Sequence, residues 1–173
     1  MATYFKQTDS AYNQQRPDWL IRSLTARGLP VGENPRALFV MGDAEEDWSV
    51  PAAMVFTMPP GYQLFRHAHT CFRFEVIVAG TLLQEDGSVL VPGDVMVAKP
   101  HETYGPHVAG KDGCTTVEVF GQLDGLYRLV SEGPDGELCE TDVRTGATAP
   151  GYVDFPVIVP GRADEDAANE LAG

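Results

Sequence analysis

The chain of 173 residues has few positive charges, few cysteines and few histidines. Its 12 Lys and Arg residues stand against 25 Asp and Glu, which gives a formal net charge of −13. Nucleic acids and anionic membranes bind proteins through a positive face, so this charge argues against both as partners. The three cysteines, Cys71, Cys114 and Cys139, are an odd number without scaffold-like spacing. We therefore expect reduced thiols in a cytoplasmic protein.

The sequence also lacks long apolar runs, and no segment approaches transmembrane length. The apolar residues fall into short runs bounded by Gly, Pro or Asp, which is typical of strands joined by tight turns. These runs cover residues 37–41, 52–58, 62–69, 72–79, 88–91, 94–98 and 115–120. Residues 85–88, Glu-Asp-Gly-Ser, predict a hairpin turn. Strands at this density without intervening helices predict an all-β sandwich or barrel.

The two ends of the chain differ from this strand-rich region. Residues 17–28 place Trp19, Leu20 and Leu24 on one face and predict a short helix. Residues 126–130 and 137–143 flank a turn-rich stretch and predict an additional hairpin. We therefore divide the chain into an N-terminal segment with a helix (1–35), a β-barrel (36–122), a C-terminal hairpin and wrapping segment (123–160) and an acidic tail (161–173).

All four histidines, His67, His69, His101 and His107, lie within one window of 41 residues. On an extended strand alternate side chains point to the same face, so His67 and His69 would share one side. Neutral imidazole is the commonest metal ligand among side chains, and two such ligands need only one or two more from a neighbouring strand. The window therefore predicts a metal site, with scattered surface histidines as the alternative.

Two blocks resemble the signatures of the cupins, small barrels built as a double-stranded β-helix or jelly roll. Residues 61–69, Gly-Tyr-Gln-Leu-Phe-Arg-His-Ala-His, followed by Gly80, resemble the first signature. Residues 92–100, Pro-Gly-Asp-Val-Met-Val-Ala-Lys-Pro, resemble the start of the second. The resemblance covers about residues 50 to 122 and implies one all-β, jelly-roll cupin barrel, with the short N-terminal helix and the C-terminal hairpin as additions.

The first signature departs from the family pattern at one position. Cupins carry a glutamate seven residues before the glycine that closes this motif, and counting back from Gly80 gives Arg73. Glu75 stands two residues later and would share the strand face of Arg73. Phe72, Phe74 and Val76 would then occupy the opposite face.

The second signature departs as well. Cupins carry a histidine eleven residues after the opening glycine of this motif, and counting from Gly93 gives Tyr104. His101 and His107 are the nearest imidazoles. The Gly-Pro pair at residues 105–106 supplies a strand irregularity just before His107. We therefore expect His107 to complete the site and His101 to be a bystander.

The resemblance implies a metal site formed by His67, His69 and His107, with Glu75 and Tyr104 as further candidate ligands. Three neutral imidazoles leave the full charge of a divalent ion and at least one open position, which favours an anionic or enolisable substrate that chelates the metal. Such sites resemble those of cupin dioxygenases, so iron(II) is the first expectation. Zinc, nickel, manganese and copper are alternatives, because histidine-rich sites also accept them.

Arg73, Tyr104 and Glu75 are the expected catalytic residues. A guanidinium buried beside a metal needs an anionic partner, which would be Glu75 or a substrate carboxylate, phenolate or enolate. The alternative places Arg73 at the barrel rim, facing solvent. Tyr104 would exchange a proton with substrate, or would be a barrel-mouth aromatic with a satisfied hydroxyl.

The expected function is that of an iron(II) dioxygenase, which cleaves a carbon–carbon bond in a small diketone, hydroxyketone or phenol. Met54, Phe56 and Met58 alternate along one run and predict an apolar interior that accepts such a molecule. The alternatives are a metal-dependent lyase or isomerase, and a non-catalytic small-molecule-binding cupin that has lost the usual glutamate ligand. Small cupins often pair through sheet edges and terminal segments, so a homodimer is also expected.

Overall fold

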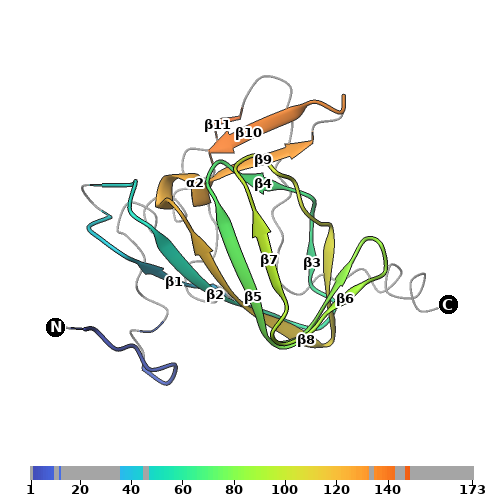
Figure 1. The fold of residues 1–173 in the computed structure, drawn as a ribbon, viewed down its shortest axis with the longest axis horizontal. Coiled ribbons are helices and arrows are strands. Elements are labelled where there is room, and N and C mark those ends of the chain that lie inside the picture. The colour runs from blue at the N-terminus through green and yellow to red at the C-terminus, as the bar shows by residue number, and fades with distance from the viewer. Residues whose placement is uncertain are drawn as a thin grey trace.

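The computed structural model describes residues 2–9, 12, 36–44, 47–132, 135–142 and 147–148 of the chain. Figure 1 shows that this part of the chain is built almost entirely of strands. The predicted helix at residues 17–28 and the predicted acidic tail at 161–173 lie outside the described residues. No described helix is long and apolar enough to cross a membrane.

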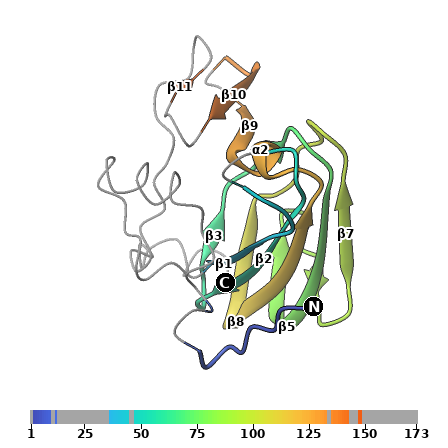
Figure 2. The same ribbon diagram turned by 90° about the vertical axis from the view of Figure 1, so that its left-hand side faces the viewer.

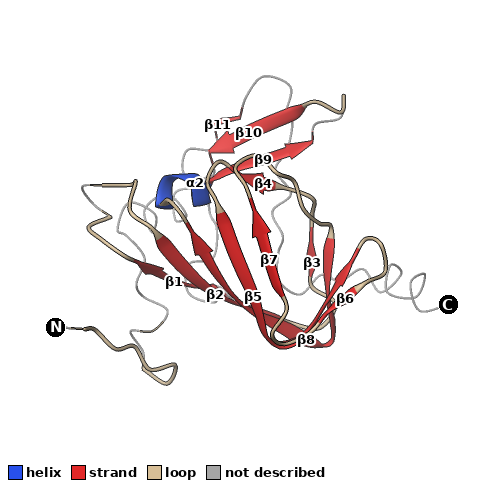
Figure 3. Cartoon of the chain, in the orientation of Figure 1, coloured by secondary structure: helices blue, strands red, loops and turns tan. Residues whose placement is uncertain are grey.

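The strands form two antiparallel sheets and are accompanied by one short described helix, α2 (Leu123–Tyr127), as Figure 3 shows. The larger sheet contains β1 (Arg36–Val40), β2 (Ala52–Met58), β3 (Gln63–Leu64), β5 (Arg73–Gln84), β6 (Val89–Leu90), β7 (Val95–Ala98) and β8 (His107–Phe120). The smaller sheet contains β4 (Ala68–His69), β9 (Arg128–Glu132), β10 (Leu138–Asp142) and β11 (Ala147–Thr148).

The path of the larger sheet is β1-β2-β8-β5-β6, with β3 paired to β8 and β7 paired to β5. Its two end strands, β1 and β6, do not pair with each other, so the described strands form an open barrel. The smaller sheet has the order β11-β10-β9-β4. The predicted all-β, jelly-roll architecture of cupin type is therefore confirmed, as a barrel that is not closed.

Local sequence patterns account for several of these elements. In β2, Met54, Phe56 and Met58 are buried as predicted, because alternate residues of a strand face the same side. The predicted hairpin turn is also present, since the backbone N–H of Gln84 donates to the carbonyl of Ser88 over 2.9 Å. Gly87 occupies this turn with a φ of 82°, a conformation that glycine adopts without steric cost.

The two longest strands, β5 and β8, cross closely at two glycines. Gly80 has a φ of 71°, and a Cβ atom built on it would lie 2.1 Å from the carbonyl oxygen of Gly113. The pairing of β5 with β8 shifts register between Ile77 and Ala79 and again between Gly80 and Leu82. Such irregularities bend a strand pair, so β5 continues past the predicted end at residue 79 and curves with β8.

The predicted run at 62–69 is not one continuous strand. Gln63 and Leu64 pair with β8 in the larger sheet, whereas Ala68 and His69 pair with β9 in the smaller one. Between them His67 forms an isolated antiparallel bridge with Tyr104. The chain therefore changes sheet within this run, and the prediction of one strand over 62–69 is wrong. Residues 67–69 themselves are consecutive bridge and strand residues, as the predicted extended triplet requires.

The predicted C-terminal hairpin is present as β9 and β10, which pair in register with Cys139 opposite Ser131. The run at 126–130 differs from the predicted strand, because its first two residues end α2 and only the rest belongs to β9. Leu123 and Leu126 of α2 are buried in the core. Through β9 the hairpin extends the sheet that contains His69.

Candidate functional site

The predicted site residues come from three neighbouring parts of the fold. His67 and Tyr104 face each other across their bridge, in which each backbone N–H donates to the other residue's carbonyl, over 3.1 and 2.9 Å. His69 lies in β4, and His107 is the first residue of β8. All three histidines are buried. The structure therefore brings together imidazoles that three different backbone segments supply.

Tyr104 lies at the centre of these imidazoles. Its ring centroid is 4.6 Å from that of His67, 5.9 Å from that of His107 and 6.3 Å from that of His69. The centroids of His67 and His69 are 5.3 Å apart. Although the predicted strand is broken, the two histidines of the triplet still converge.

Hydrogen bonds fix the tautomer of His67. Its Nδ1 lies 2.8 Å from the carbonyl oxygen of Phe65, which accepts only, so Nδ1 carries the proton. In the neutral ring Nε2 is then an acceptor, and it accepts a hydrogen bond from the hydroxyl of Tyr104 over 3.1 Å. By contrast, Nδ1 of His69 and both ring nitrogens of His107 are buried without a hydrogen-bond partner.

The three imidazoles are uncharged at neutral pH. Burial lowers the pKa of His67 to about 4. The carbonyl of Phe65 partly opposes this shift, and the positive charge of Arg73 adds to it. Burial and Arg73 also lower the pKa of His107 to about 4. The pKa of His69 lies well below its usual range because of burial, with smaller effects of His67 and Arg73. Neutral imidazole is the form that binds metals.

Arg73 lies inside the barrel rather than at its rim. Its side chain is 3% exposed, and its guanidinium carbon lies 4.4 Å from the centroid of the Tyr104 ring. Two carboxylates accompany it: Nε donates to Oε2 of Glu118 over 2.9 Å, and Nη2 lies 2.9 Å from Oε2 of Glu75. Nη1 is buried without a partner. The predicted pairing of Arg73 with Glu75 is therefore present, and Glu118 adds a second acid.

The sequence reasoning missed Glu118, which lies on β8 directly opposite Glu75 of β5. It accepts hydrogen bonds from Arg73 and, over 3.1 Å, from the hydroxyl of Thr116. The one signal in the sequence is an acid between Val117 and Val119, in a run otherwise read as an apolar strand. The pairing of β8 with β5 must be known before the side chain of Glu118 can be placed inside the barrel.

The buried carboxyl group of Glu75 binds its proton more tightly than an exposed glutamate does. Burial raises the pKa of Glu75 to about 7, with Arg73 opposing this shift and Glu118 adding to it. Oε2 of Glu75 lies 2.9 Å from Nη2 of Arg73 but outside hydrogen-bond geometry, whereas Glu118 accepts two hydrogen bonds. Two like charges at one site favour protonation of one of them. Glu75 is therefore partly protonated at neutral pH.

The phenol of Tyr104 stays protonated, because burial raises its pKa well above its usual range although Arg73 acts against this. For Arg73, burial alone would lower the pKa, but Glu118 and then Tyr104 and Glu75 raise it above its usual range. The site thus contains one fixed cation, one phenolic proton donor and three neutral imidazoles.

His101 lies apart from this cluster, since its side chain is exposed and its φ is 64°. Among the described residues, no group of three or more His, Cys, Asp or Glu side chains is already arranged to hold a metal ion. In this arrangement the hydroxyl of Tyr104 also occupies Nε2 of His67.

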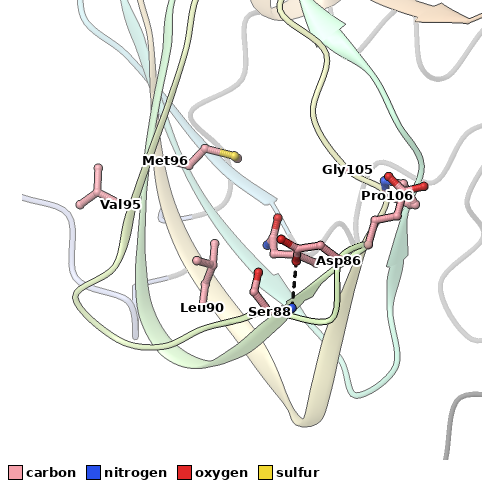
Figure 4. Close-up of a pocket in the computed structure, with 9 residues that line it drawn as sticks. Asp86, Ser88, Leu90, Val95, Met96, Gly105 and Pro106 are labelled. Atoms are coloured by element: carbon pink, nitrogen blue, oxygen red, sulfur yellow. Dashed lines mark hydrogen bonds between the residues drawn. The ribbon is translucent and has the colours of Figure 1, made fainter.

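A pocket of about 410 Å³ lies near the cluster, although none of the three histidines, Arg73 or Tyr104 lines it. Figure 4 shows it between the 84–88 turn, the inward side chains of Leu90 and Met96, and the Gly105-Pro106 pair. Met96 is the strand partner of Glu75, and Pro106 directly precedes His107. The complete lining is Gln84, Glu85, Asp86, Ser88, Leu90, Val95, Met96, Gly105 and Pro106.

Comparison of the sequence with protein-family models gives no match, and comparison with curated proteins gives none either. Solved structures do match. An acetylacetone dioxygenase from Acinetobacter johnsonii is 12% identical over 80% of this chain and 83% of its own, with a TM-score of 0.45. KdgF from Halomonas sp. is 22% identical over 50% and 77%, with a TM-score of 0.39. An RmlC-like cupin from Shewanella frigidimarina is 22% identical over 50% and 76%, with a TM-score of 0.40.

Identities this low concern the fold alone, so the chemistry of the site rests on the residues of this chain.

Proposed function

We propose that the chain is a metal-dependent enzyme acting on a small organic molecule, with His67, His69 and His107 as the metal ligands. One observation carries this proposal: three buried, neutral imidazoles converge on one tyrosine, and three of their ring nitrogens have no hydrogen-bond partner. Buried polar atoms without partners are rare, and those in native proteins require an explanation. A divalent transition metal is the ligand that neutral imidazoles suit.

The donor chemistry fits such an ion, and one rearrangement is required. His67 donates from Nδ1 to Phe65, so it can bind a metal only through Nε2. That nitrogen accepts the hydroxyl of Tyr104, and binding therefore requires Tyr104 to release it. Iron(II) is the first expectation, with zinc, nickel, manganese and copper as alternatives. A bound divalent ion would supply a Lewis acid, and iron(II) would also supply a redox-active centre for dioxygen chemistry.

The chain's own residues would bind and orient the substrate. Nη1 of Arg73 is a buried cationic donor without a partner, so it can donate to an enolate, phenolate or carboxylate oxygen. The released hydroxyl of Tyr104 remains protonated and is a proton donor within the same space. Glu118 and Glu75 hold the Arg73 guanidinium in place. We assign Arg73 and Tyr104 contact with substrate, and Glu75 and Glu118 positioning roles.

The nearby pocket supports a small substrate, although the site residues themselves do not line it. Its volume of about 410 Å³ lies at the small end of ligand pockets. The carboxylates of Asp86 and of Glu85, which is ion-paired with Arg66, line the pocket, and Asp86 disfavours a molecule that is already strongly anionic. A neutral molecule that gains negative charge only beside Arg73 meets both conditions. Small diketones, hydroxyketones and phenols have this property, and cleavage of their carbon–carbon bond by an iron(II) dioxygenase is the specific reaction proposed.

Metal analysis tests the ligand assignment. Protein purified without chelator and reconstituted anaerobically should contain close to one iron or other transition ion per chain, measured by mass spectrometry of the metal. His67→Ala, His69→Ala and His107→Ala should each lose it, while His101→Ala serves as the matched control and keeps it. Wild-type protein that takes up no transition metal would refute the proposal. Loss in His101→Ala but not in His107→Ala would show that the third ligand is misassigned.

A second function is favoured by the hydrogen bond between Tyr104 and His67. With that bond kept and no three-donor group arranged among the described residues, the same pocket would bind a small molecule without metal or catalysis. Calorimetry with a panel of small diketones and phenols, in the presence and absence of EDTA, separates the two. Binding that EDTA leaves unchanged, without oxygen consumption, supports the metal-free binding function.

A further inference from the structure

Gln84 belongs both to the pocket and to the surroundings of the histidines. It is the last residue of β5 and lines the pocket. In the strand register it lies directly opposite His107, the first residue of β8, and Figure 2 shows these two strands side by side. Side chains that lie directly opposite each other in an antiparallel pair share one face, with Cβ atoms about 4.5–5.5 Å apart. Gln84 therefore stands next to a proposed metal ligand.

The hairpin turn fixes the backbone of Gln84. Its N–H donates to the carbonyl of Ser88 over 2.9 Å, and its carbonyl accepts from the N–H of Gly87 over 3.1 Å. Only the side-chain torsions of Gln84 are then free, and these have few preferred values. The amide can therefore reach only the space near the pocket and His107.

The amide nitrogen Nε2 of Gln84 is buried and has no hydrogen-bond partner among the described residues. This nitrogen carries two N–H donors, and a buried donor without an acceptor destabilises the fold. Both ring nitrogens of His107 are also without a partner in this part of the chain, so the two neighbours do not bond to each other. An acceptor from outside the chain would explain the free amide of Gln84.

The other polar side chains of the pocket differ from Gln84 in this respect. Glu85 forms an ion pair with Arg66, and Asp86 accepts from the backbone N–H of Ser88 over 2.9 Å, the bond drawn in Figure 4. Glu85, Asp86 and Ser88 are all exposed, whereas Gln84 is partly buried. Gln84 is thus the pocket residue that offers a buried, unused donor.

The remaining wall of the pocket is apolar and includes Leu90, Met96 and Pro106. Ligand pockets are typically apolar, with a few polar groups that fix the orientation of the ligand. An amide donor is itself neutral and suits an uncharged oxygen, while a carboxylate would be repelled by Asp86. The pocket therefore favours a molecule with an apolar body and a carbonyl or hydroxyl oxygen.

We propose that Gln84 is a substrate-binding residue, whose Nε2 donates to an uncharged carbonyl or hydroxyl oxygen of the molecule in the pocket. The inference rests on the proposed function, because it places the substrate between the pocket and His107. Arg73 would hold the oxygen that gains negative charge, and Gln84 would hold the one that stays uncharged. The site would then prefer a molecule with two oxygen groups to one with a single oxygen.

Calorimetry on the zinc-loaded full chain tests the proposal, because zinc has no redox chemistry of its own. The probes are 1-phenylbutane-1,3-dione and 4-phenylbutan-2-one, which has the same carbon skeleton and lacks one carbonyl. Gln84→Met removes the donor and keeps the side-chain length, so it should weaken binding of the diketone by about 10-fold and of the monoketone by less than about 3-fold. Gln84→Glu should weaken the diketone at least as much, because a carboxylate accepts and does not donate. Gln63→Met, at an exposed residue of β3, is the matched control and should change neither affinity.

Zinc content and circular dichroism are measured for each variant, the titrations are repeated in EDTA, and Gln84→Leu replaces Gln84→Met if the latter does not fold. Unchanged affinity for the diketone in Gln84→Met overturns the proposal, and so does equal weakening of both ketones, which would indicate a change in pocket shape. Loss of zinc in Gln84→Met would make Gln84 a positioning residue of His107 and would also overturn it. A wild type that binds the diketone without zinc, and loses it in Gln84→Met, would refute the metal-dependent function and support the role of Gln84. A wild type that binds neither probe refutes the role of Gln84, whatever its zinc content.

Discussion

Glu75→Gln and Glu118→Gln should change the stability of the protein in opposite directions. Both carboxyl groups lie within ion-pair distance of Arg73, and both side chains are almost fully buried. A simple count of ion pairs predicts that either substitution destabilises the fold. Their contacts distinguish them, because Glu118 accepts two well-directed hydrogen bonds, whereas Glu75 makes only an ion-pair contact with Nη2 of Arg73 over 2.9 Å.

For Glu75 the magnitude follows from its pKa, which rises from 4.5 to about 7 in the folded protein. Because the folded-state pKa is the higher one, the fold binds the proton more tightly than the unfolded chain does. The resulting stability is complete below pH 4.5 and is lost as the pH rises through 7. The interval corresponds to about 3 kcal/mol. Glutamine cannot ionise, so Glu75→Gln should be about 3 kcal/mol more stable than wild type at pH 8 and equal to it near pH 4.

Glu118→Gln removes the charged partner of Arg73 and keeps the shape of the side chain. Leaving a buried guanidinium with only a partly protonated acid costs about 3 kcal/mol or more. The loss should shrink as the pH rises, because Glu75 then ionises and replaces the missing charge. The two variants should therefore diverge most at neutral pH.

Urea unfolding, followed by circular dichroism in EDTA between pH 4.5 and 8, measures both effects. Glu137→Gln, at an exposed carboxyl group, is the control and should stay within about 0.5 kcal/mol of wild type. Equal destabilisation by the two buried variants would show that both acids are charged, and the assignment of the proton to Glu75 would then be wrong.

Three further predictions concern the histidines, Tyr104 and the glycine crossing. The pKa values of His67 and His107 fall from 6.5 in the unfolded chain to about 4 in the folded protein. The stability present above pH 6.5 should therefore be lost as the pH falls through 4, by about 3 kcal/mol for each residue. Thermal unfolding in EDTA should show this loss, and His107→Gln should make the melting temperature less dependent on pH. Tyr104→Phe frees Nε2 of His67 and should tighten zinc binding, measured by competition with a chelator. The lost hydrogen bond should lower the free energy of unfolding of the metal-free protein by about 1 kcal/mol. Weaker zinc binding in this variant would indicate that the hydroxyl is itself a metal ligand. Gly80→Ala should destabilise by more than about 2 kcal/mol in urea, well beyond Gly87→Ala, where nothing lies within 4 Å.

Sequence patterns predicted what depends on neighbours in the chain. The alternation of Met54, Phe56 and Met58 requires only the period of a strand, and the turn at Gly87 requires only its own four residues. The first motif predicted His67 and His69 at one site, and the second pointed to Tyr104, from which His107 was inferred as the nearest imidazole beyond the Gly-Pro pair. The roles assigned to these residues remain predictions.

Long-range pairing decided what the sequence left open. The apolar run at 62–69 does not reveal that its ends join different sheets, because both ends are equally compatible with a strand. Glu118 becomes a site residue only through its place opposite Glu75. The residues next to Glu75 and Glu118 in the sequence do not reveal which residues of the two strands lie opposite each other.

The register of β5 itself argues that the buried charges serve the site. A slip by one residue would turn Phe72 and Phe74 inward and Arg73 and Glu75 outward, and hydrophobic burial alone favours that arrangement. Ile77 and Leu82, which are buried farther along the strand, already face inward in the observed register, and the register shifts after Ile77 keep both there. The observed register therefore holds charges in the interior next to the three histidines, at a cost that hydrophobic side chains of similar size would avoid. A strand that buries Arg73 between two carboxyl groups and beside three histidines is best explained by chemistry on its inner side.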